Sequence, residues 1–288
     1  MAPFFVKLIQ SNGMANVSYA EPYAGGAGTA INLLLGGNVK KIFINDANIC
    51  IYSFWKYVVE TPGRFIKAIE ENDVSLENWF RWNSIMKSAR IPSFELGFAT
   101  FFLSRTNRSG ILTAGPIGGR TKEKQGAATY KIDCRFNKAD MIARIKEISL
   151  YKESIVVSNQ DAIKFLGSLP SDDNLLVYLD PPYFNQGKSL YLNYYKENDH
   201  RVLSEYLSQV KDFKWVLSYD NVDKIREFYK DFDLYEFNLF YTAQNVKEGK
   251  ELLTHSKNLT MPVDLVLKRN RRNIALRKID HDGRSSED

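Results

Sequence analysis

The sequence predicts an α/β fold whose parallel sheet is interrupted by a mainly helical insertion. Up to about residue 60, and again from about residue 151, short apolar runs typical of buried strands alternate with helical segments. This alternation is the pattern of a parallel sheet. Between these two parts the chain changes character, and helical segments follow one another without the strand rhythm.

The first part contains two expected strands and two expected helices. A glycine turn follows the first strand, and Gly36 and Gly37 end the first helix, because glycine accepts the backbone conformation found just after a helix. Pro62 and Gly63 end the second helix. In chain order, strand, helix, strand and helix cover residues 17–23, 24–37, 40–46 and 47–63.

The insertion is expected at residues 61–150. Its residues 108–136 are rich in Gly, Pro, Lys and Arg and have no clean period, which predicts a loop or hairpin. The last helix of the insertion has Asn137 as its expected N-cap. The four expected helices cover residues 63–72, 75–90, 94–107 and 137–151.

The strand rhythm returns after the insertion. Strands are expected within residues 153–169, 174–183, 213–221, 232–243 and 262–270, with helices at 199–211 and 222–231. The chain is therefore expected to form an α/β domain from residues 1–60 and 151–270, the insertion at 61–150, and a basic, mobile tail at 271–288.

The composition is that of an ordinary globular protein. The 288 residues are 44% hydrophobic and 25% charged, and the net charge of +5 does not by itself indicate an anionic partner. The two cysteines and three histidines have no metal-ligand spacing, so no metal is expected. No apolar run reaches the ~18 residues of a membrane-spanning helix, and the N-terminus lacks the features of a signal peptide.

Acidic residues mark the ends of the expected strands. Glu21, Asp46 and Asp180 lie at or just beyond three strand ends, and Asp161 follows a fourth. In open α/β sheets, ligands bind beyond the carboxyl ends of the strands. These four acids therefore indicate a binding site at that edge.

Two of the motifs also have simpler explanations. The run EPYAGGAG, residues 21–28, follows a strand and opens a helix, so its glycines allow a ligand to approach the backbone closely. Such a turn can equally well only pack a helix on a sheet. Asp46 is placed to accept hydrogen bonds from ribose hydroxyls, and it can also serve as a helix N-cap.

The run DPPY, residues 180–183, is more specific. Two prolines fix two φ angles and remove two backbone donors, so the Asp180 carboxylate and the neighbouring carbonyls form a rigid cluster of acceptors. Such a cluster suits an amino group that donates two hydrogen bonds, and Tyr183 supplies a ring on which a planar base can stack. A strand that simply ends at a proline turn is the alternative.

In this order, the glycine turn, the second-strand acid, the insertion, Asp161 and DPPY resemble the S-adenosylmethionine-dependent DNA adenine methyltransferases of the Dam-like class, alpha group. Three further segments are similar to that family: TNRSGI at 106–111, CRFNKADMIARI at 134–145 and VLSYDN at 216–221. The resemblance covers roughly residues 4–268. It implies a Rossmann-like class I methyltransferase sheet, mostly parallel with seven strands, and an inserted DNA-recognition domain.

The resemblance also assigns roles to the motif residues. It implies that the methionine part of S-adenosylmethionine is lined by Glu21, Pro22, Tyr23, Gly25, Gly26 and Gly28. Asp46 would hold the ribose, and Asp161 beside Ala162 the adenine amino group of the cofactor. The target adenine would be received by Asp180, Pro181, Pro182 and Tyr183.

The insertion would hold and read double-stranded DNA, and its Gly-rich basic run at 115–126 matches a hairpin of the family. A solvated surface charge is the simpler explanation for each basic residue taken singly. The expected DNA-binding residues are Arg105, Asn107, Arg108, Arg120, Lys122, Lys124 and Arg135.

The implied activity is site-specific methylation of the exocyclic amino group of a flipped adenine, by direct displacement and without a covalent enzyme intermediate. One departure concerns the cofactor. The family usually has a Gly-Gly-Lys segment just before the stretch matching residues 2–9, whereas Met1 stands there in this sequence. Either the start is truncated or the cofactor is bound without that lysine, and Lys7 is not an obvious substitute.

Other functions stay open at this point. An RNA or protein-glutamine methyltransferase shares the proline loop but more often has Asn in place of Asp180, and a catalytically weak DNA-binding accessory protein is a third alternative. A dehydrogenase is rejected, because the Gly-x-Gly-x-x-Gly spacing is absent. We expect a cytoplasmic protein, bacterial or phage-encoded, from restriction-modification or phage defence, with possible defence-system partners. The amino-acid sequence alone predicts neither the DNA recognition sequence nor the oligomeric state.

Overall fold

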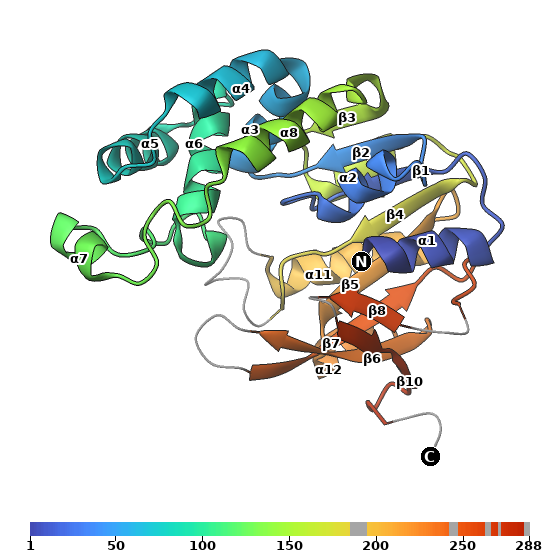
Figure 1. Cartoon of the computed structure of the whole chain (residues 1–288). Coiled ribbons are helices and arrows are strands. Elements are labelled where there is room, and N and C mark those ends of the chain that lie inside the picture. The colour runs from blue at the N-terminus through green and yellow to red at the C-terminus, as the bar shows by residue number, and fades with distance from the viewer. Residues whose placement is uncertain (185–194, 242–246, 263–265, 270–271, 285–288) are drawn as a thin grey trace. The chain divides into compact units, whose positions relative to one another are not determined.

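The computed structural model describes residues 1–184, 195–241, 247–262, 266–269 and 272–284. The chain divides into two compact units (Figure 1). The first consists of Met1–Ala47 and Gln160–Asp288, and the second of Asn48–Asn159. Each unit is described separately below.

The first unit is an α/β unit. Its strands are β1 (Ser18–Glu21), β2 (Lys41–Asn45), β4 (Leu175–Leu179), β5 (Lys214–Asp220), β6 (Leu234–Tyr241), β7 (Lys247–His255), β8 (Val266–Arg269), β9 (Arg272–Ala275) and β10 (Arg277–Ile279). Its helices are α1 (Ala2–Ser11), α2 (Gly28–Leu35), α9 (Ala162–Ser168), α11 (Glu197–Gln209) and α12 (Asp223–Phe228).

The main sheet of this unit is mixed. Its strands follow the order β10-β6-β7-β5-β4-β1-β2, while β8 and β9 pair separately. β1 is parallel to β2 and β4, and β4 is parallel to β5. β7 runs antiparallel between β5 and β6. The parallel strands therefore end at one edge, as the sequence predicts.

The set of strands needs a correction. Seven strands were expected, none of them in the predicted tail, but among the described residues the short β10 of that segment pairs antiparallel with β6 at the sheet edge. A second difference is β7, which the sequence pattern did not predict, since the first half of that strand is charged and contains Gly249. Helix α1 was also not predicted.

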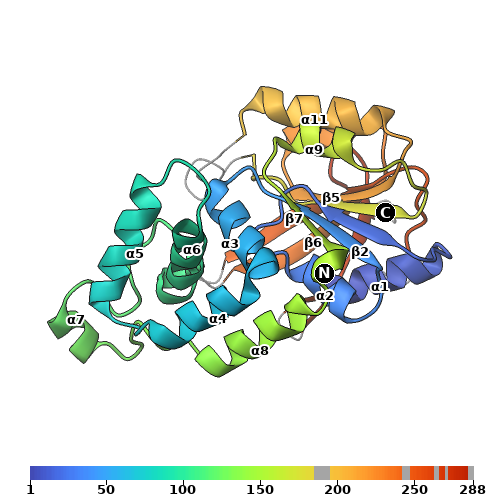
Figure 2. The ribbon, with the colours of Figure 1, turned by 90° about the horizontal axis from the view of Figure 1, so that it is seen from above.

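Helices cover both faces of this sheet. Figure 2 shows α9 and α11 on one face, and α1 and α2 on the other. Under α11 and α12 the core contains Trp215, Tyr219 and Leu203, each 0% exposed. Burying side chains of this size contributes about 1.5–3 kcal/mol each. This core fixes β4 and β5, the two strands that lead to the acidic sheet edge.

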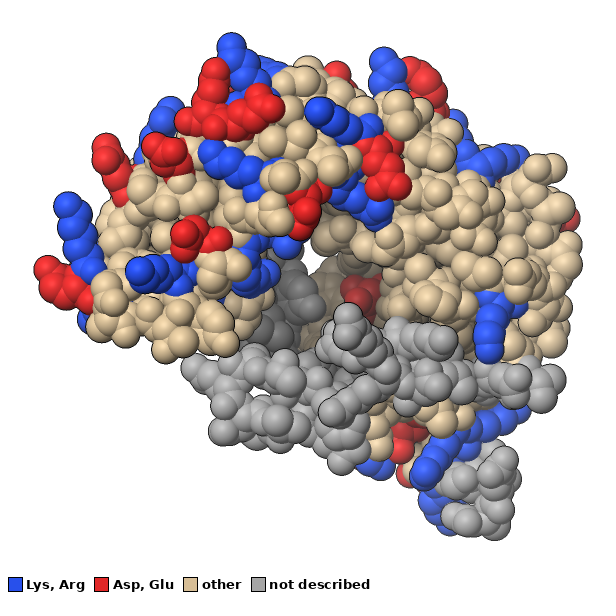
Figure 3. Space-filling view, in the orientation of Figure 1, with Lys and Arg blue, Asp and Glu red and all other residues tan. Residues whose placement is uncertain are grey.

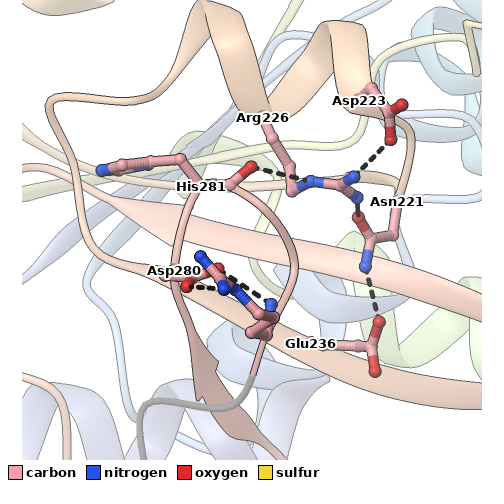
Figure 4. A network of polar contacts seen from close by, with 7 residues as sticks. Asn221, Asp223, Arg226, Glu236, Asp280 and His281 are labelled. Carbon is pink, nitrogen blue, oxygen red and sulfur yellow. Dashed lines mark hydrogen bonds and ion pairs between the residues drawn. The ribbon is translucent and has the colours of Figure 1, made fainter.

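The end of the chain is attached to this unit. The sequence predicts a mobile tail at 271–288, yet within its described residues 272–284 β9 pairs with β8 and β10 pairs with β6. Arg226 of α12 donates from Nε to the backbone oxygen of His281 at 3.2 Å and from Nη1 to Asn221 at 2.5 Å (Figure 4). Asn221 in turn donates to Glu236 of β6 at 2.6 Å. Backbone pairing and this network hold the segment in place.

The second unit is mainly helical. Gly97 lets α6 pack closely on α3, because an added Cβ would lie 2.6 Å from the backbone oxygen of Ser53. Phe65, Phe98 and Phe102, each 0% exposed, form part of the core of this unit. Its elements are α3 (Ile49–Glu60), α4 (Pro62–Glu71), α5 (Leu76–Ser88), α6 (Phe94–Thr106), η1 (Arg108–Gly110), α7 (Lys122–Ala127), α8 (Lys138–Ser149), η2 (Lys152–Ser154) and β3 (Ile155–Ser158).

Local capping explains where its helices begin. Asn137 caps α8 as predicted, accepting a hydrogen bond from the backbone nitrogen of Asp140. The expected loop at 108–136 contains the short helix α7, which Thr121 caps by accepting from the Lys124 nitrogen. The cap at Thr121 was not recognised within a run dominated by glycine and charge.

Candidate active site

The turn between β1 and α2 is held against the end of β2. Gly25 has a φ of +47°, in the left-handed region that favours glycine. Its backbone nitrogen donates to Oδ2 of Asp46 at 3.0 Å. The N-cap of α3 is Asn48, so the alternative explanation of Asp46 as that cap does not apply.

Asn45 joins three segments of this edge. Its side-chain nitrogen donates to the backbone oxygens of Pro22 and Gln160, both at 3.0 Å. Its side-chain oxygen accepts from the Gln160 nitrogen at 2.9 Å. Asn45 is 1% exposed, so these bonds satisfy a buried amide. The network brings the residue before Asp161 beside the β1 end.

Asp161 itself is exposed and caps α9. Its Oδ1 accepts from the backbone nitrogens of Ile163 at 3.0 Å and Lys164 at 3.3 Å. Ala162 is buried in the first turn of this helix. The structure therefore gives Asp161 a capping contact through Oδ1.

Glu21 is a buried carboxyl at the end of β1. Its Oε1 accepts from the Ala30 nitrogen of α2 at 3.0 Å and from the Tyr19 hydroxyl at 3.1 Å. Burial raises the pKa of Glu21 to about 8, against the lowering effect of these two hydrogen bonds. Glu21 thus ties the start of α2 to the sheet with a carboxyl that is mainly protonated at neutral pH.

The DPPY loop after β4 is fixed by β5. The Ser218 hydroxyl donates to Oδ1 of Asp180 at 2.9 Å and lies 2.8 Å from the Tyr178 hydroxyl. The Phe184 nitrogen donates to Oδ1 of Asp220 at 2.9 Å. Asp180 is exposed, while Pro181 and Pro182 are buried. The loop is thus held before and after its two prolines.

The Tyr183 ring is held by strand β7. Its hydroxyl donates to Oε1 of Glu251 on β7 at 2.5 Å. Glu251 is 3% exposed. Sequence reasoning missed Glu251 together with β7, and a charged residue next to the apolar pair Leu252 and Leu253 was the one available signal.

A pocket of about 430 Å³ lies between these motifs. Its walls include six of the predicted site residues, Glu21, Tyr23, Gly26, Gly28, Asp180 and Tyr183. The other predicted residues of this edge are outside its lining: Pro22, Gly25, Asp46, Asp161, Ala162, Pro181 and Pro182. Met1, Ser218 and Glu251 line it as well, although no site role was predicted for them.

In the second unit, Asn107 is an interior residue. It is 0% exposed, and it accepts from the Trp79 indole nitrogen at 2.6 Å. Its amide donates to the backbone oxygens of Ile111 and Leu112, both at 2.9 Å. Its side chain therefore shapes the loop after α6 from inside, where the sequence had suggested a DNA contact.

The other predicted DNA-binding residues of this unit lie on its surface. A Cβ added at Gly115 would lie 3.4 Å from Nε of Arg120 and 3.5 Å from Nη2 of Arg108, so these two guanidinium groups converge. Burial lowers the pKa of Arg105, and the charge of Arg135 lowers it further. Lys122 and Lys124 are on α7. Figure 3 shows basic and acidic side chains interspersed over this unit.

Sequence comparison decides the family. Residues 1–243 match the sequence model of the D12 class N6 adenine-specific DNA methyltransferases. The chain belongs to this family. It is therefore an N6-adenine-specific DNA methyltransferase that uses S-adenosylmethionine, and its α/β sheet is a methyltransferase sheet. Among curated proteins, none matches the sequence significantly.

Solved structures with a similar course of the chain include other methyltransferases. M. capricolum TrmK in complex with S-adenosyl-homocysteine has 8% identity and a TM-score of 0.33, over 88% of this chain and 69% of that one. Precorrin-6y C5,15-methyltransferase from Geobacter metallireducens GS-15 has 12% identity and a TM-score of 0.33, over 88% and 87%. The rRNA methyltransferase aviRa from Streptomyces viridochromogenes has 10% identity and a TM-score of 0.32, over 88% and 82%.

Among the described residues, no helix has the length and apolar character needed to cross a membrane. In the same part of the chain, no group of His, Cys, Asp and Glu side chains is arranged to hold a metal ion.

Proposed function

We propose that this enzyme methylates adenine at a specific sequence in double-stranded DNA, with the base turned out of the helix and received by Asp180 and Tyr183. The family gives the reaction, methylation of adenine N6. The observation that supports the residue roles is that the β1–α2 turn, Asp180 and Tyr183 line the same pocket. A base inside a duplex cannot reach such a pocket unless it leaves the stack.

The pocket suits the cofactor in size and charge. Its volume of about 430 Å³ lies within the range of about 300–1,000 Å³ usual for small-molecule sites. S-adenosylmethionine supplies an electrophilic methyl group on a positively charged sulfur. The carboxylates of Asp180 and Glu251 line the pocket and favour a cation there. The glycine turn, held by Asp46, would bind the methionine part close to the backbone.

Asp180 would act on the amino group of the target base. The lone pair of this nitrogen is delocalised into the ring, so the amino group is a weak nucleophile. A carboxylate that accepts one N–H, together with the Pro181 carbonyl accepting the other, favours a pyramidal nitrogen. The hydrogen bond from Ser218 fixes the carboxylate before the base arrives. Orientation of this kind can supply up to about 7–11 kcal/mol of the barrier.

The second unit would hold and read the DNA. The guanidinium groups of Arg108 and Arg120 converge near Gly115. A phosphate group would bind such a pair through several charge-assisted hydrogen bonds. We assign the recognition of DNA to residues 61–150 on this basis, and the methyl transfer to residues 1–60 and 151–270.

The test is methyl transfer from labelled S-adenosylmethionine to unmethylated plasmid DNA and, in parallel, to RNA. Sequencing of modified bases would then identify the methylated sequence. Asp180→Ala should lower the single-turnover rate by about 10²–10³-fold while DNA affinity changes little. Asp173→Ala, an exposed aspartate before β4, is the matched control.

Two results would contradict the proposal. Methylation of RNA alone would exclude the DNA substrate. Equal rates for Asp180→Ala and the wild-type enzyme would exclude the role of Asp180, even if adenine in DNA is methylated.

A further inference from the structure

We propose that Glu251 is a positioning residue for the methyl transfer, because it fixes the Tyr183 ring on which the target base stacks. This inference rests on the proposed role of Tyr183. It extends the site to β7, a strand that contains none of the predicted site residues. Glu251 acts through Tyr183 and is not itself expected to contact the reacting atoms.

The location of Glu251 supports this role. In the sheet it stands opposite Asp220 of β5 and Phe237 of β6. It is therefore in the interior of the sheet and not at a frayed edge. Its side chain is 3% exposed and reaches the wall of the pocket that Tyr183 and Asp180 also line.

Glu251 is a buried carboxylate on β7. Burying a charged group is unfavourable unless it is well paired, and apolar replacements of buried charges are often neutral or stabilising. The neighbours Leu252 and Leu253 show that apolar side chains fit this strand. Oε1 of Glu251 accepts a hydrogen bond from the Tyr183 hydroxyl at 2.5 Å.

The rest of the loop leaves the Tyr183 side chain as the last group to be fixed. Pro181 and Pro182 restrict the backbone before it. After it, the Phe184 nitrogen is bonded to Asp220 at 2.9 Å. The ring of a tyrosine still rotates about two side-chain torsions. A hydrogen bond at its far end fixes both, so the ring presents one face in one direction.

A fixed ring face matters for transfer more than for binding. Offset stacking between aromatic rings depends on their relative position. A base that stacks on a mobile ring is still bound, but its amino group is less often in line with the methyl group. Misplacement by about 1 Å can lower a rate by about 10²-fold.

The experiment compares Glu251→Gln, Glu251→Ala, Tyr183→Phe and the double variant Tyr183→Phe with Glu251→Ala. Two duplexes contain the sequence that the enzyme recognises. One carries an unmethylated target adenine for the rate, and the other carries 2-aminopurine at that position for fluorescence. We measure the single-turnover rate with the adenine duplex, the affinities for cofactor and DNA, and the quenching of flipped 2-aminopurine. Lys250→Ala, the exposed neighbour on the same strand, is the control.

We expect Glu251→Ala and Tyr183→Phe each to lower the rate about tenfold, one hydrogen bond being worth about 1–1.5 kcal/mol, with affinities changed less than about threefold. The double variant should be no slower than either. Glu251→Gln should restore most of the rate, because its amide oxygen still accepts from Tyr183. Quenching should fall in Glu251→Ala, in Tyr183→Phe and in the double variant, but not in Glu251→Gln.

Several results would overturn the inference. A normal rate in a folded Glu251→Ala protein would do so, and so would additive losses in the double variant. If Glu251→Gln is as slow as Glu251→Ala, the rate depends on the negative charge of Glu251 and not on the position of the Tyr183 ring. If the wild-type enzyme methylates nothing, the proposed function fails. Glu251 is then judged by urea denaturation, where additive effects of the two substitutions would show that the pair is not coupled.

Discussion

The hydroxyl of Ser218 on β5 donates a hydrogen bond to Oδ1 of Asp180 at 2.9 Å. Because a hydroxyl has one proton, the Tyr178 hydroxyl 2.8 Å away must donate to Ser218. The three groups thus form a directed chain that ends on the carboxylate. Tyr178 and Ser218 are 9% and 2% exposed, so two buried hydroxyls orient the exposed carboxylate of Asp180.

Ser218→Ala should therefore slow methyl transfer while removing only one hydroxyl from the pocket wall. Losing one oriented hydrogen bond to a charged group is worth about 1.5–3 kcal/mol, so we expect a single-turnover rate about 10–100-fold lower. Cofactor and DNA affinities should change less than about threefold, since the cofactor contacts are assigned to the β1–α2 turn and the DNA contacts to the second unit.

Ser204→Ala is the control, since Ser204 is also buried but bonds only to a carbonyl of its own helix, that of Arg201. A Ser218→Ala enzyme with a normal rate, or one that loses cofactor affinity instead, would show that the chain does not orient Asp180.

The buried carboxyl of Glu21 predicts a pH dependence of stability. Burial raises its pKa from the ordinary 4.5 to about 8, so between these values the folded protein keeps a proton that the unfolded chain has released. Stability should fall as the pH rises through this window, by up to about 1.4 kcal/mol per pH unit. Below about pH 4.5 both states are protonated and the contribution is constant.

Urea denaturation from pH 5 to pH 8 measures this slope. Glu21→Gln should flatten it, because the amide does not titrate and still accepts from the Ala30 nitrogen. Glu205→Gln, an exposed position on α11, should leave the slope unchanged. Parallel curves for the wild-type protein and Glu21→Gln would mean that Glu21 ionises in the folded state as in the unfolded chain.

Strand endings were predictable from the sequence, and the contacts between distant strands were not. Asp46, Asp161 and Asp180 could be located because apolar runs end just before them. Asn45 could not be recognised, since its partners Pro22 and Gln160 are distant in the chain.

Glu251 shows the same limit for the DPPY loop. It is 68 positions from Tyr183, and the two meet only once β7 has paired with β5. The strand itself was not predicted because its first half is polar and lacks the alternation of apolar and polar residues that is typical of a half-buried strand. Pairing inside the sheet gives such a residue a position that local pattern does not reveal.

Asn107 shows a different limit, because the sequence does not say on which side of a helix end a polar residue lies. Asn107→Ala would leave the Trp79 indole N–H and two backbone oxygens without their partners, in a site that is 0% exposed at Asn107. We expect a loss of about 3 kcal/mol or more in the free energy of unfolding, since each unpaired buried group costs about 1–3 kcal/mol. Chemical denaturation measures this loss.

The neighbouring Arg108 provides the contrast, because it is exposed. Arg108→Ala should unfold at the wild-type denaturant concentration and bind DNA more weakly. If Asn107→Ala instead keeps full stability and loses DNA affinity, its side chain contacts DNA and the interior bonds are dispensable.

The convergence of Arg108 and Arg120 at Gly115 predicts how DNA binding depends on salt. Two cations at one position repel each other unless an anion lies between them, and a DNA phosphate is the anion that the substrate offers. Each phosphate contact contributes about 0.9 to the slope of log K against log salt concentration. Arg108→Ala and Arg120→Ala should each reduce the slope by about that amount, and the double variant by about twice as much. Fluorescence anisotropy with a labelled duplex at several salt concentrations measures the slopes.

Arg144→Ala, on α8 and paired with Glu147 at 2.8 Å, is the control in the same unit. If the slopes stay at the wild-type value while discrimination between sequences is lost, the two arginines contact base edges and not phosphates.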